Sequence, residues 1–543
     1  MAVDLSVALK RWTAVVGQDR VFADEATLDR YAASTLPRAP RPLAVLRPRN
    51  REEVVGCVAA ARRSGIPLYP ISRGKNWGYG DACPVREGQV VLDLSGMDRI
   101  LEVDQTLAYA VIEPGVTQGQ LAERLEALGG ALWLDSTGAG PDTSIAGNIL
   151  DRGFGHTPYG NRPQFVCGLE VVTGTGEVLR TGLGHYPAAR AAATFPYGIG
   201  PSLDGLFLQS NFGIVTRLCV WLMPRPEAYA LFVCSLPRDE DLPRAVDTLR
   251  GLKLDGTLRS VVHVGNDLRL ISSGRTAASL GAEGGALSTA QREALRRAAG
   301  IGAWTFAGGL YGDPGQVGAA LRRLRRSFRP HGWQMNVVTS RRLDLADRVL
   351  PLAGRFRFGR QALGKLRAVR GLFNLNRGMP SRQFLAGAYW KRRQGLPEDF
   401  PARADPALDN CGMLWLSPVM PMTGEQAREL LALVEPLFAE HGFDFFVTFS
   451  TVNERTLAAV MTIAFDKENE DERRRAEACY ESCFGALMRA GFIPYRVGIQ
   501  SMADLAGGSQ GYWPLVAKLR TALDPDGVVA PGRYQPDLPA PEA

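Results

Sequence analysis

The chain has 543 residues, which is long enough for two or three domains around large buried cores. Hydrophobic residues make up 45% of it and charged residues 22%, a composition that is typical of globular proteins and excludes a disordered one. The net charge of +7 comes with no recognised nucleic-acid motif, so we expect no nucleic-acid partner.

The sequence contains no pattern typical of a membrane protein or a metal protein. It has no run of about eighteen apolar residues, and residues 1–17 lack a basic segment followed by an apolar block, so we expect no membrane attachment, no signal peptide and a cytoplasmic protein. Of the eight cysteines only Cys479 and Cys483 are close, with no histidine or second cysteine pair nearby. We therefore expect no metal site.

Helices and strands alternate along the first part of the chain. The stretch after Pro48 predicts a helix that ends at Gly65, and residues 66–72 predict a short buried strand. Two alternating stretches, 89–97 and 100–115, predict further strands, and Thr117 is the expected N-cap of a helix that ends near Gly129. Residues 1–225 therefore predict one α+β domain, and a strand from 229 follows a proline-rich boundary.

Two glycine-rich loops indicate a phosphate-bearing ligand. The first, "PISRGKNWGYG" at 70–80, has neither the Rossmann spacing nor a Walker ending, yet Arg73 and Lys75 accompany its exposed backbone amides. The second, residues 138–162, again offers glycines, small hydroxyls and an asparagine. Two such loops in one domain predict a dinucleotide.

Several long motifs, in order, resemble the vanillyl-alcohol oxidase and p-cresol methylhydroxylase family of flavoproteins. The matching stretches are "ISRGKNWGYG", "SIAGNILDRGFGHTPYG", "LEVVTGTGEVLRTG", "FPYGIGPSLDGLFLQSNFGIVT" and "DPDGVVAPGR". The resemblance implies an α+β fold of two domains. A PCMH-type FAD-binding domain would be formed by both chain ends (1–225 and 490–543), and a cap domain with an antiparallel sheet (226–489) would cover the flavin.

The same resemblance assigns cofactor contacts residue by residue. Those to the pyrophosphate, flavin and adenine parts of FAD would come from Ser72, Arg73, Gly74, Lys75, Asn76, Gly147, Asn148, Gly155, Tyr159, Ile214 and Val215. Arg533 would place positive charge near the flavin pyrimidine ring and stabilise reduced anionic flavin. His156, inside the second loop, is interpreted as a structural donor beside the flavin.

A phenol site is also implied by the resemblance. Tyr79 of "GYG" matches one of three groups that hold a substrate phenolate in phenol-oxidising members, and Tyr495 and Arg496 of "IPYRVG" match the other two. A permanent positive charge and two hydroxyl donors lower the pKa of a bound phenol. We therefore expect oxidation of a 4-alkylphenol or 4-hydroxybenzyl compound, by hydride transfer from the benzylic carbon to flavin N5 through a p-quinone methide.

An acid near flavin N5 assists the reaction in the oxidase branch of the family. The matching slot here holds Gly138, and the nearest replacement is Asp142, our candidate base. The departure leaves both the base and the water-addition step open.

Covalent attachment of the flavin is open as well. Met413 occupies the position of the histidine used by the oxidase branch, and Asn76 stands where bicovalent relatives have another histidine, which excludes both of those links. Tyr389 of "GAYWKRR" is the candidate for a tyrosyl link, with different spacing from the family pattern. Non-covalent FAD and a link to Cys411 are the alternatives.

Other functions remain open from sequence. The substrate could be a larger aromatic natural product or a non-phenolic alcohol, or the chain could be a basic binding protein with a degenerate flavin site. We expect a small aromatic substrate, a homodimer, and oxygen or a soluble electron acceptor. The acid-free basic stretch 348–397 keeps an acidic electron carrier as an alternative.

Overall fold

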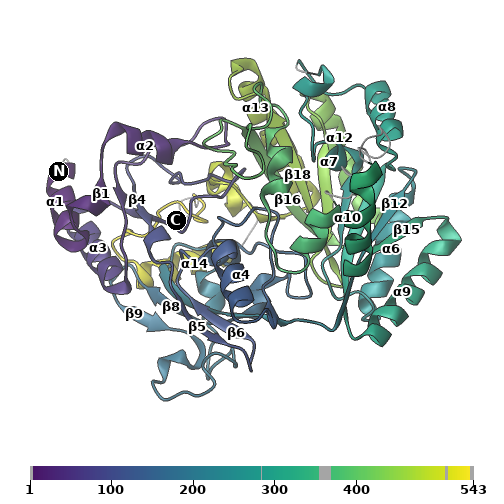
Figure 1. The fold of residues 1–543 in the computed structure, drawn as a ribbon. Coiled ribbons are helices and arrows are strands. Elements are labelled where there is room, and N and C mark those ends of the chain that lie inside the picture. Colours follow the sequence, from purple (N-terminus) through teal and green to yellow (C-terminus); the bar gives the residue numbers. More distant parts are fainter. Residues whose placement is uncertain (1–3, 283, 354–368, 508–510, 538–543) are drawn as a thin grey trace.

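The computed structural model describes residues 4–282, 284–353, 369–507 and 511–537. Two regions lie against each other (Figure 1). One contains both ends of the chain, and the other is built on a large sheet from the middle of the chain.

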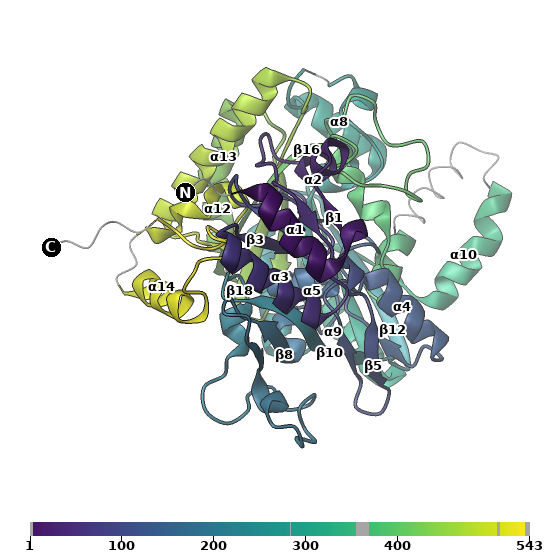
Figure 2. The ribbon, with the colours of Figure 1, turned by 90° about the vertical axis from the view of Figure 1, so that its left-hand side faces the viewer.

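The first region begins with a small sheet in the order β1-β2-β4-β3, in which β2, β4 and β3 are parallel. Its strands are β1 (Val21–Phe22), β2 (Val45–Leu46), β3 (Leu68–Ile71) and β4 (Val90–Asp93). Its helices are α1 (Leu5–Val16), α2 (Glu25–Ala32) and α3 (Arg51–Ser64). Helices α1 and α3 pack together on its outer side (Figure 2), where the Trp12 indole donates to the Cys57 carbonyl.

A second, antiparallel sheet completes the N-terminal part, in the order β5-β6-β10-β8-β9. Its strands are β5 (Ile100–Asp104), β6 (Tyr109–Ile112), β8 (Val166–Val172), β9 (Val178–Arg180) and β10 (Ile214–Trp221). The other elements here are α4 (Gln118–Ala127), α5 (Ile145–Leu150), and the paired strands β7 (Leu132–Trp133) and β11 (Met223–Pro224). The predicted capping of α4 by Thr117 is present as a full capping box.

The C-terminal segment returns to the first sheet. After helix α14 (Tyr512–Leu523), Val529 pairs with Leu68 of β3 in a parallel bridge. The Leu68 amide donates to the Val528 carbonyl (2.8 Å), and the Ala530 amide donates to the Leu68 carbonyl (2.7 Å). The N- and C-terminal parts therefore share one core, as the sequence predicts.

The cap contains an eight-stranded sheet in the order β15-β12-β14-β13-β17-β18-β16-β19, and all its pairings are antiparallel. Its strands are β12 (Ala228–Leu236), β13 (His263–Asn266), β14 (Trp304–Gly312), β15 (Gln334–Val338), β16 (Gly412–Pro421), β17 (Phe446–Thr451), β18 (Thr456–Phe465) and β19 (Pro494–Arg496). This sheet and the mixed sheets and helices of the first region confirm the predicted α+β class.

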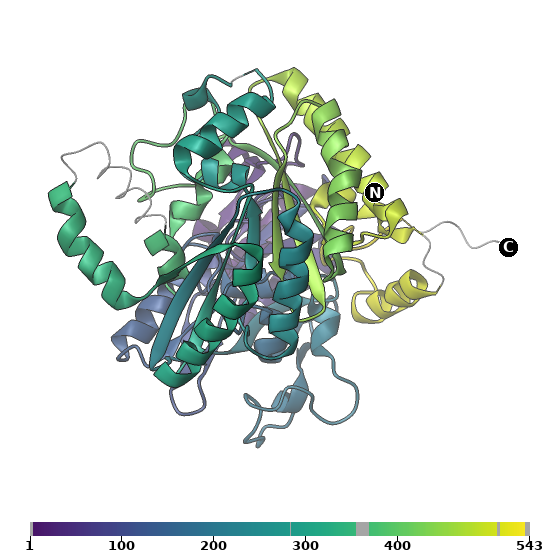
Figure 3. The ribbon, with the colours of Figure 1, turned by 90° about the vertical axis from the view of Figure 1, so that its right-hand side faces the viewer.

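Helices cover the outer face of the cap sheet (Figure 3). These helices are α6 (Asp241–Leu254), α9 (Pro314–Phe328), α12 (Gly424–Glu440) and α13 (Glu470–Ala490). Phe232 and Phe306 of the sheet pack with Leu249 and Val434 of these helices in the largest hydrophobic cluster. The inner face, which is turned toward the first region, carries α7 (Asp267–Ile271), α8 (Thr289–Ala299) and α10 (Ser340–Ala353). There Leu268 of α7 packs with Phe446, and Leu343 of α10 packs with Leu231.

The predicted domain limits stay predictions. Strand β12 begins at Ala228, close to the limit at 225, whereas β19 still pairs with the cap sheet after the limit at 489. The basic stretch 348–397 falls partly outside the described residues, at 354–368. Within its described part, Arg382 pairs with Asp142 and Arg393 pairs with Asp466.

Candidate active site

The glycine loop after β3 fixes Tyr79 in the interior. A Cβ added at Gly78 would lie 2.9 Å from Cγ of Trp415, and Gly78 has φ +77°, so glycine is required by both space and conformation. The Gly78 amide donates to the Thr35 hydroxyl (2.8 Å). Tyr79 is only 1% exposed, its hydroxyl hydrogen bonds with Ser417 of β16, and Trp415 packs edge-on against its ring.

Tyr495 and Arg496 reach the same place from the edge strand β19. Arg496 pairs with Ser417 in the register of β19 and β16, which brings its guanidinium over the Tyr79 ring, with Cζ 4.2 Å from the centroid. The fold thus brings together the three residues expected at a phenolate, although more than 400 positions separate Tyr79 from Tyr495 and Arg496. Whether they bind a phenolate stays a prediction.

Asp151, which the sequence analysis missed, joins Arg496 to Arg533. Its carboxylate lies 3.2 Å from Arg496 and 2.5 Å from Arg533. Asn76 also belongs to this cluster, because its amide oxygen accepts from Arg496 and its amide nitrogen lies 3.4 Å from Asp151. The signal in the sequence was an acid directly after the short apolar helix α5, which we had no reason to connect with two distant arginines.

The charges in this cluster stabilise one another. Burial disfavours the ionised form of Asp151, but Arg533 and Arg496 outweigh it and hold the pKa of this carboxyl below its usual value. Burial raises the pKa of the Tyr79 hydroxyl, and raises that of Tyr495 well above its usual value. Both tyrosines therefore stay protonated and able to donate hydrogen bonds at neutral pH.

One polar atom of the cluster lacks a partner. Nε of Arg496 is buried and makes no hydrogen bond within the part of the chain that the structure describes. A buried guanidinium nitrogen without an acceptor is costly. A ligand oxygen at this position, from a flavin or a phenolate, would satisfy it, so the residues fit the group that the sequence implies.

The loop residues expected at the FAD pyrophosphate differ in whether they are still placed to contact a phosphate. The loop meets the start of α5, where a Cβ added at Gly147 would lie 3.3 Å from the Ser72 hydroxyl. The Arg73 guanidinium instead donates to the Gly115 carbonyl (2.7 Å), and the Lys75 ammonium pairs with Asp405 (2.9 Å). The backbone of the loop, with Gly74 at φ +63°, remains the candidate for contact with phosphate, whereas these two cations have protein partners.

The other expected cofactor residues lie around the second loop and on β10. Asn148 accepts from Arg162 (3.0 Å), and Gly155 packs so closely on Asp135 that an added Cβ would lie 1.8 Å from its carboxylate. Ile214 and Val215 are buried at the start of β10, paired with β8. All of these assignments stay predictions.

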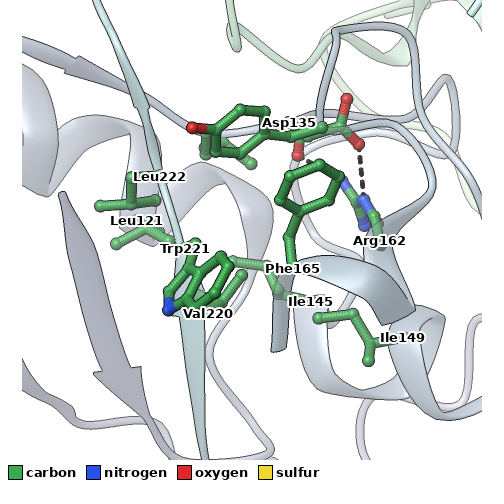
Figure 4. A pocket seen from close by; sticks show the side chains of 11 residues that line it. Leu121, Asp135, Ile145, Ile149, Arg162, Phe165, Val220, Trp221 and Leu222 are labelled. Atoms are coloured by element: carbon green, nitrogen blue, oxygen red, sulfur yellow. Dashed lines mark hydrogen bonds and ion pairs between the residues drawn. The ribbon is translucent and has the colours of Figure 1, made fainter. Parts of the chain in front are cut away.

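A small pocket lies beside this loop, between α4, α5 and the end of β10 (Figure 4). Tyr159 stacks on Phe165 there, with ring centroids 4.1 Å apart. The Asp135–Arg162 ion pair (2.8 Å) closes one side, and the other walls are mostly apolar. The pocket belongs to the packing that holds the second loop against the sheet.

Asp142 and Tyr389 lie in separate surroundings. Both carboxylate oxygens of Asp142 accept from Arg382 at 2.8 Å, and its side chain is 45% exposed. Tyr389 is fully buried, donates to Asp409 (2.5 Å), and shares a cluster with Trp77 and Cys411. The candidate base is thus engaged with a cation, while both candidate attachment residues are neighbours in one cluster.

Two kinds of site are not found among the described residues. No group of three or more His, Cys, Asp or Glu side chains there could hold a metal ion, and the eight cysteines are all free and buried. No helix of this part of the chain is both long enough and apolar enough to cross a membrane.

Comparison with known proteins gives this architecture a family. A family model described as an FAD binding domain matches residues 42–182. The chain is 38% identical over 532 residues to a 1'-carboxy-chondrochloren decarboxylase from Chondromyces crocatus, covering 98% of this chain and 97% of that protein. It is 30% identical over 543 residues to the flavoprotein subunit of 4-cresol dehydrogenase [hydroxylating] from Pseudomonas putida, covering 98% and 96%.

Solved structures agree over the whole length. Substrate-bound p-cresol methylhydroxylase matches with a TM-score of 0.87 and 29% identity, and 4-ethylphenol oxidase from Gulosibacter chungangensis, in complex with isoeugenol, with 0.88 and 28%. Each match covers 99% of this chain and 98% of the other. FAD is therefore the cofactor, as predicted, and the chain belongs to the vanillyl-alcohol oxidase and p-cresol methylhydroxylase family of FAD-dependent oxidoreductases.

Proposed function

We propose that this oxidoreductase oxidises a para-substituted phenol, of the 4-alkylphenol or 4-hydroxybenzyl alcohol type. The observation that supports the proposal most is the position of Arg496 over Tyr79, with a buried Nε that lacks an acceptor. A phenolate oxygen would accept from this guanidinium and from the hydroxyls of Tyr79 and Tyr495. Charge-assisted hydrogen bonds of this kind contribute about 1.5–3 kcal/mol each.

The cluster favours this chemistry because it stabilises the phenolate. Negative charge on the phenolate oxygen is delocalised to the para carbon, so the benzylic C–H bond more easily releases a hydride and leaves a p-quinone methide. Bound FAD supplies the hydride acceptor. Backbone groups of Ser72, Gly74 and Gly147 would hold its pyrophosphate, and Arg533 would face its pyrimidine ring.

The experiment compares two substrates that differ only at the phenolic oxygen. Anaerobic stopped-flow absorbance should show flavin reduction by 4-ethylphenol and none by 4-ethylanisole, in which a methyl group blocks ionisation. Deuterium at the benzylic carbon should slow the reduction by 4-ethylphenol. Equal reduction by both compounds would show that ionisation of the phenol is not required and would exclude the proposed role of the cluster.

A carboxylated phenol is the second candidate substrate. It is favoured by the full-length similarity to a protein named as a decarboxylase of a 1'-carboxy compound, and by Gly138, which leaves no acid in the slot expected beside N5. Release of carbon dioxide during flavin reduction by 3-(4-hydroxyphenyl)propanoate would support this candidate. Flavin reduction without release of carbon dioxide would contradict this candidate and leave the first one, a para-substituted phenol that is oxidised without decarboxylation.

The attachment of the flavin and its reoxidation are tested separately. We propose a tyrosyl link at Tyr389, whose hydroxyl already donates to Asp409. Yellow colour should then remain in the acid-precipitated pellet of the wild type and be lost from that of Tyr389→Phe; colour in both pellets would favour Cys411.

The electron acceptor is identified by mixing the reduced enzyme with air. Fast reoxidation would identify oxygen as the acceptor, and slow reoxidation would favour a soluble electron carrier.

A further inference from the structure

A pair of histidines lies next to the phenol cluster and has no role in the chemistry described above. His156 comes from the second glycine-rich loop and His263 from β13 of the cap, and their ring centroids are 4.2 Å apart. Phe154 connects the pair to the cluster, because its ring lies 6.4 Å from His263 and 5.5 Å from Tyr495. Phe154 thus neighbours both the histidine pair and the expected phenolate position.

The hydrogen bonds of this pair are incomplete. Nδ1 of His263 bonds with the Ser450 hydroxyl (2.8 Å), whereas its Nε2 is buried and makes no hydrogen bond within the described residues. The ring of His156 makes none there either; only its backbone amide donates, to Asp135 (3.1 Å). His156 and His263 both keep partial accessibility. A buried imidazole nitrogen without a partner, beside a second ring that makes no hydrogen bond, indicates a polar ligand group.

The local charge balance favours an anionic group. The carboxylate of Asp135 is already paired with Arg162 (2.8 Å). The buried ammonium of Lys253 donates to the Ser260 carbonyl (2.9 Å), and no carboxylate of the described residues lies within ion-pair distance of it. Burial lowers the pKa of both histidines most strongly; Arg162 lowers that of His156 further, and Lys253 that of His263, against the Gly155 backbone and the Asp135 carboxylate. A bound anion would favour the protonated, positively charged form of the histidines and so act against these effects.

We propose that His156, supported by His263 and Ser450, binds a carboxylate on the para side chain of the substrate. This inference rests on the proposed phenol chemistry, because it places the phenolate at Arg496 and the carboxylate at the histidine pair. It makes the histidine pair the determinant that separates carboxylated phenols from plain alkylphenols. His156 is then a substrate contact and His263 a positioning residue.

The test uses two ligands with the same three-carbon side chain, 3-(4-hydroxyphenyl)propanoate and 4-propylphenol. Rates of flavin reduction in the FAD-loaded protein, measured against ligand concentration, give a dissociation constant for each. In His156→Phe the constant for the propanoate should rise by about tenfold or more, the loss expected for a hydrogen bond to a charged group. The constant for 4-propylphenol should change less than about twofold.

Two conservative variants and a control separate binding from folding. His156→Gln and His263→Gln keep a donor and should retain part of the preference for the propanoate. His185→Gln, at an exposed histidine that hydrogen bonds with the Gly182 carbonyl, should leave both constants unchanged. If His156→Phe loses flavin, the two glutamine variants still test the inference. A purely structural role of the histidines would raise the dissociation constants of both ligands equally.

Each outcome has a distinct meaning. Equal changes for the two ligands, or a wild type that is reduced by 4-propylphenol and not by the propanoate, would overturn this inference and leave the phenol chemistry intact. Failure of both ligands, together with 4-ethylphenol, to reduce the flavin would overturn the proposed function, and this inference with it.

Discussion

Asp151 is the residue on which the electrostatics of the site depend, because it alone contacts both Arg496 and Arg533 among the described residues. The Asp142–Arg382 pair offers a matched comparison, since it has the same chemistry with a carboxylate that is 45% exposed rather than 10% exposed. A buried ion pair that loses one partner leaves an uncompensated charge, whereas an exposed pair is screened by water.

We therefore expect Asp151→Asn to lower the free energy of unfolding by about 3 kcal/mol, and Asp142→Asn by less than about 1 kcal/mol. Urea denaturation of the two variants beside the wild type measures both values. Equal losses would mean that Asp151 does not compensate the two arginines.

His263 makes the stability dependent on pH. Burial lowers its pKa from 6.5 to about 4, outweighing the nearby Gly155 backbone and Asp135 carboxylate, which act in the opposite direction; Lys253 adds to the lowering. The unfolded chain takes up a proton as the pH falls below about 6.5, while the folded chain resists it until about 4, so stability is lost in this window.

At pH 5 this single group should cost the wild type about 2 kcal/mol relative to pH 8. The His263→Gln variant should lose that much less stability over the same interval. Parallel pH profiles of the urea midpoints in the two proteins would contradict the assignment.

At the scale of elements, the loop after β3 depends on two features of Gly78, a left-handed backbone and contact with Trp415. Gly88 shares the first feature, with φ +83°, but an added Cβ there would have no atom within 4 Å. Gly88→Ala should therefore cost only about 1–2 kcal/mol, the strain of the backbone.

Gly78→Ala should cost more, because the Trp415 ring must also move, and with it Tyr79. We expect flavin reduction by 4-ethylphenol to slow in Gly78→Ala and to remain normal in Gly88→Ala. Normal kinetics in both variants would show that the loop does not depend on this contact.

Much at this scale could be predicted from the sequence, because local signals determine it. The stop of α3 at Gly65, with φ +65°, and the cap of α4 at Thr117 agree with the prediction. Helix α4 ends at Ala127, and its C-cap is Leu128 rather than the predicted Gly129. Asp151 and the pairing of β19 with the cap sheet were missed, because they depend on contacts between residues hundreds of positions apart.

At the scale of the whole molecule, the FAD-binding region depends on closure by the C-terminal segment. Val529 is fully buried against β3, whereas Val178 on β9 is 41% exposed. Val529→Asp should destabilise the protein by at least about 4 kcal/mol and release FAD, because it buries an unpaired charge. Val178→Asp should have little effect, and FAD retention measured after gel filtration distinguishes the two.

The central claim, that Arg496 holds a substrate phenolate beside the flavin, is tested most directly by anaerobic flavin absorbance with 4-ethylphenol. The wild type and an exposed-arginine control, Arg38→Ala (73% exposed), should bleach at the same rate. Arg496→Ala, with FAD still bound, should bleach about 10- to 100-fold more slowly, because the phenolate loses a charge-assisted hydrogen bond. Bleaching of Arg496→Ala at the wild-type rate would contradict the account.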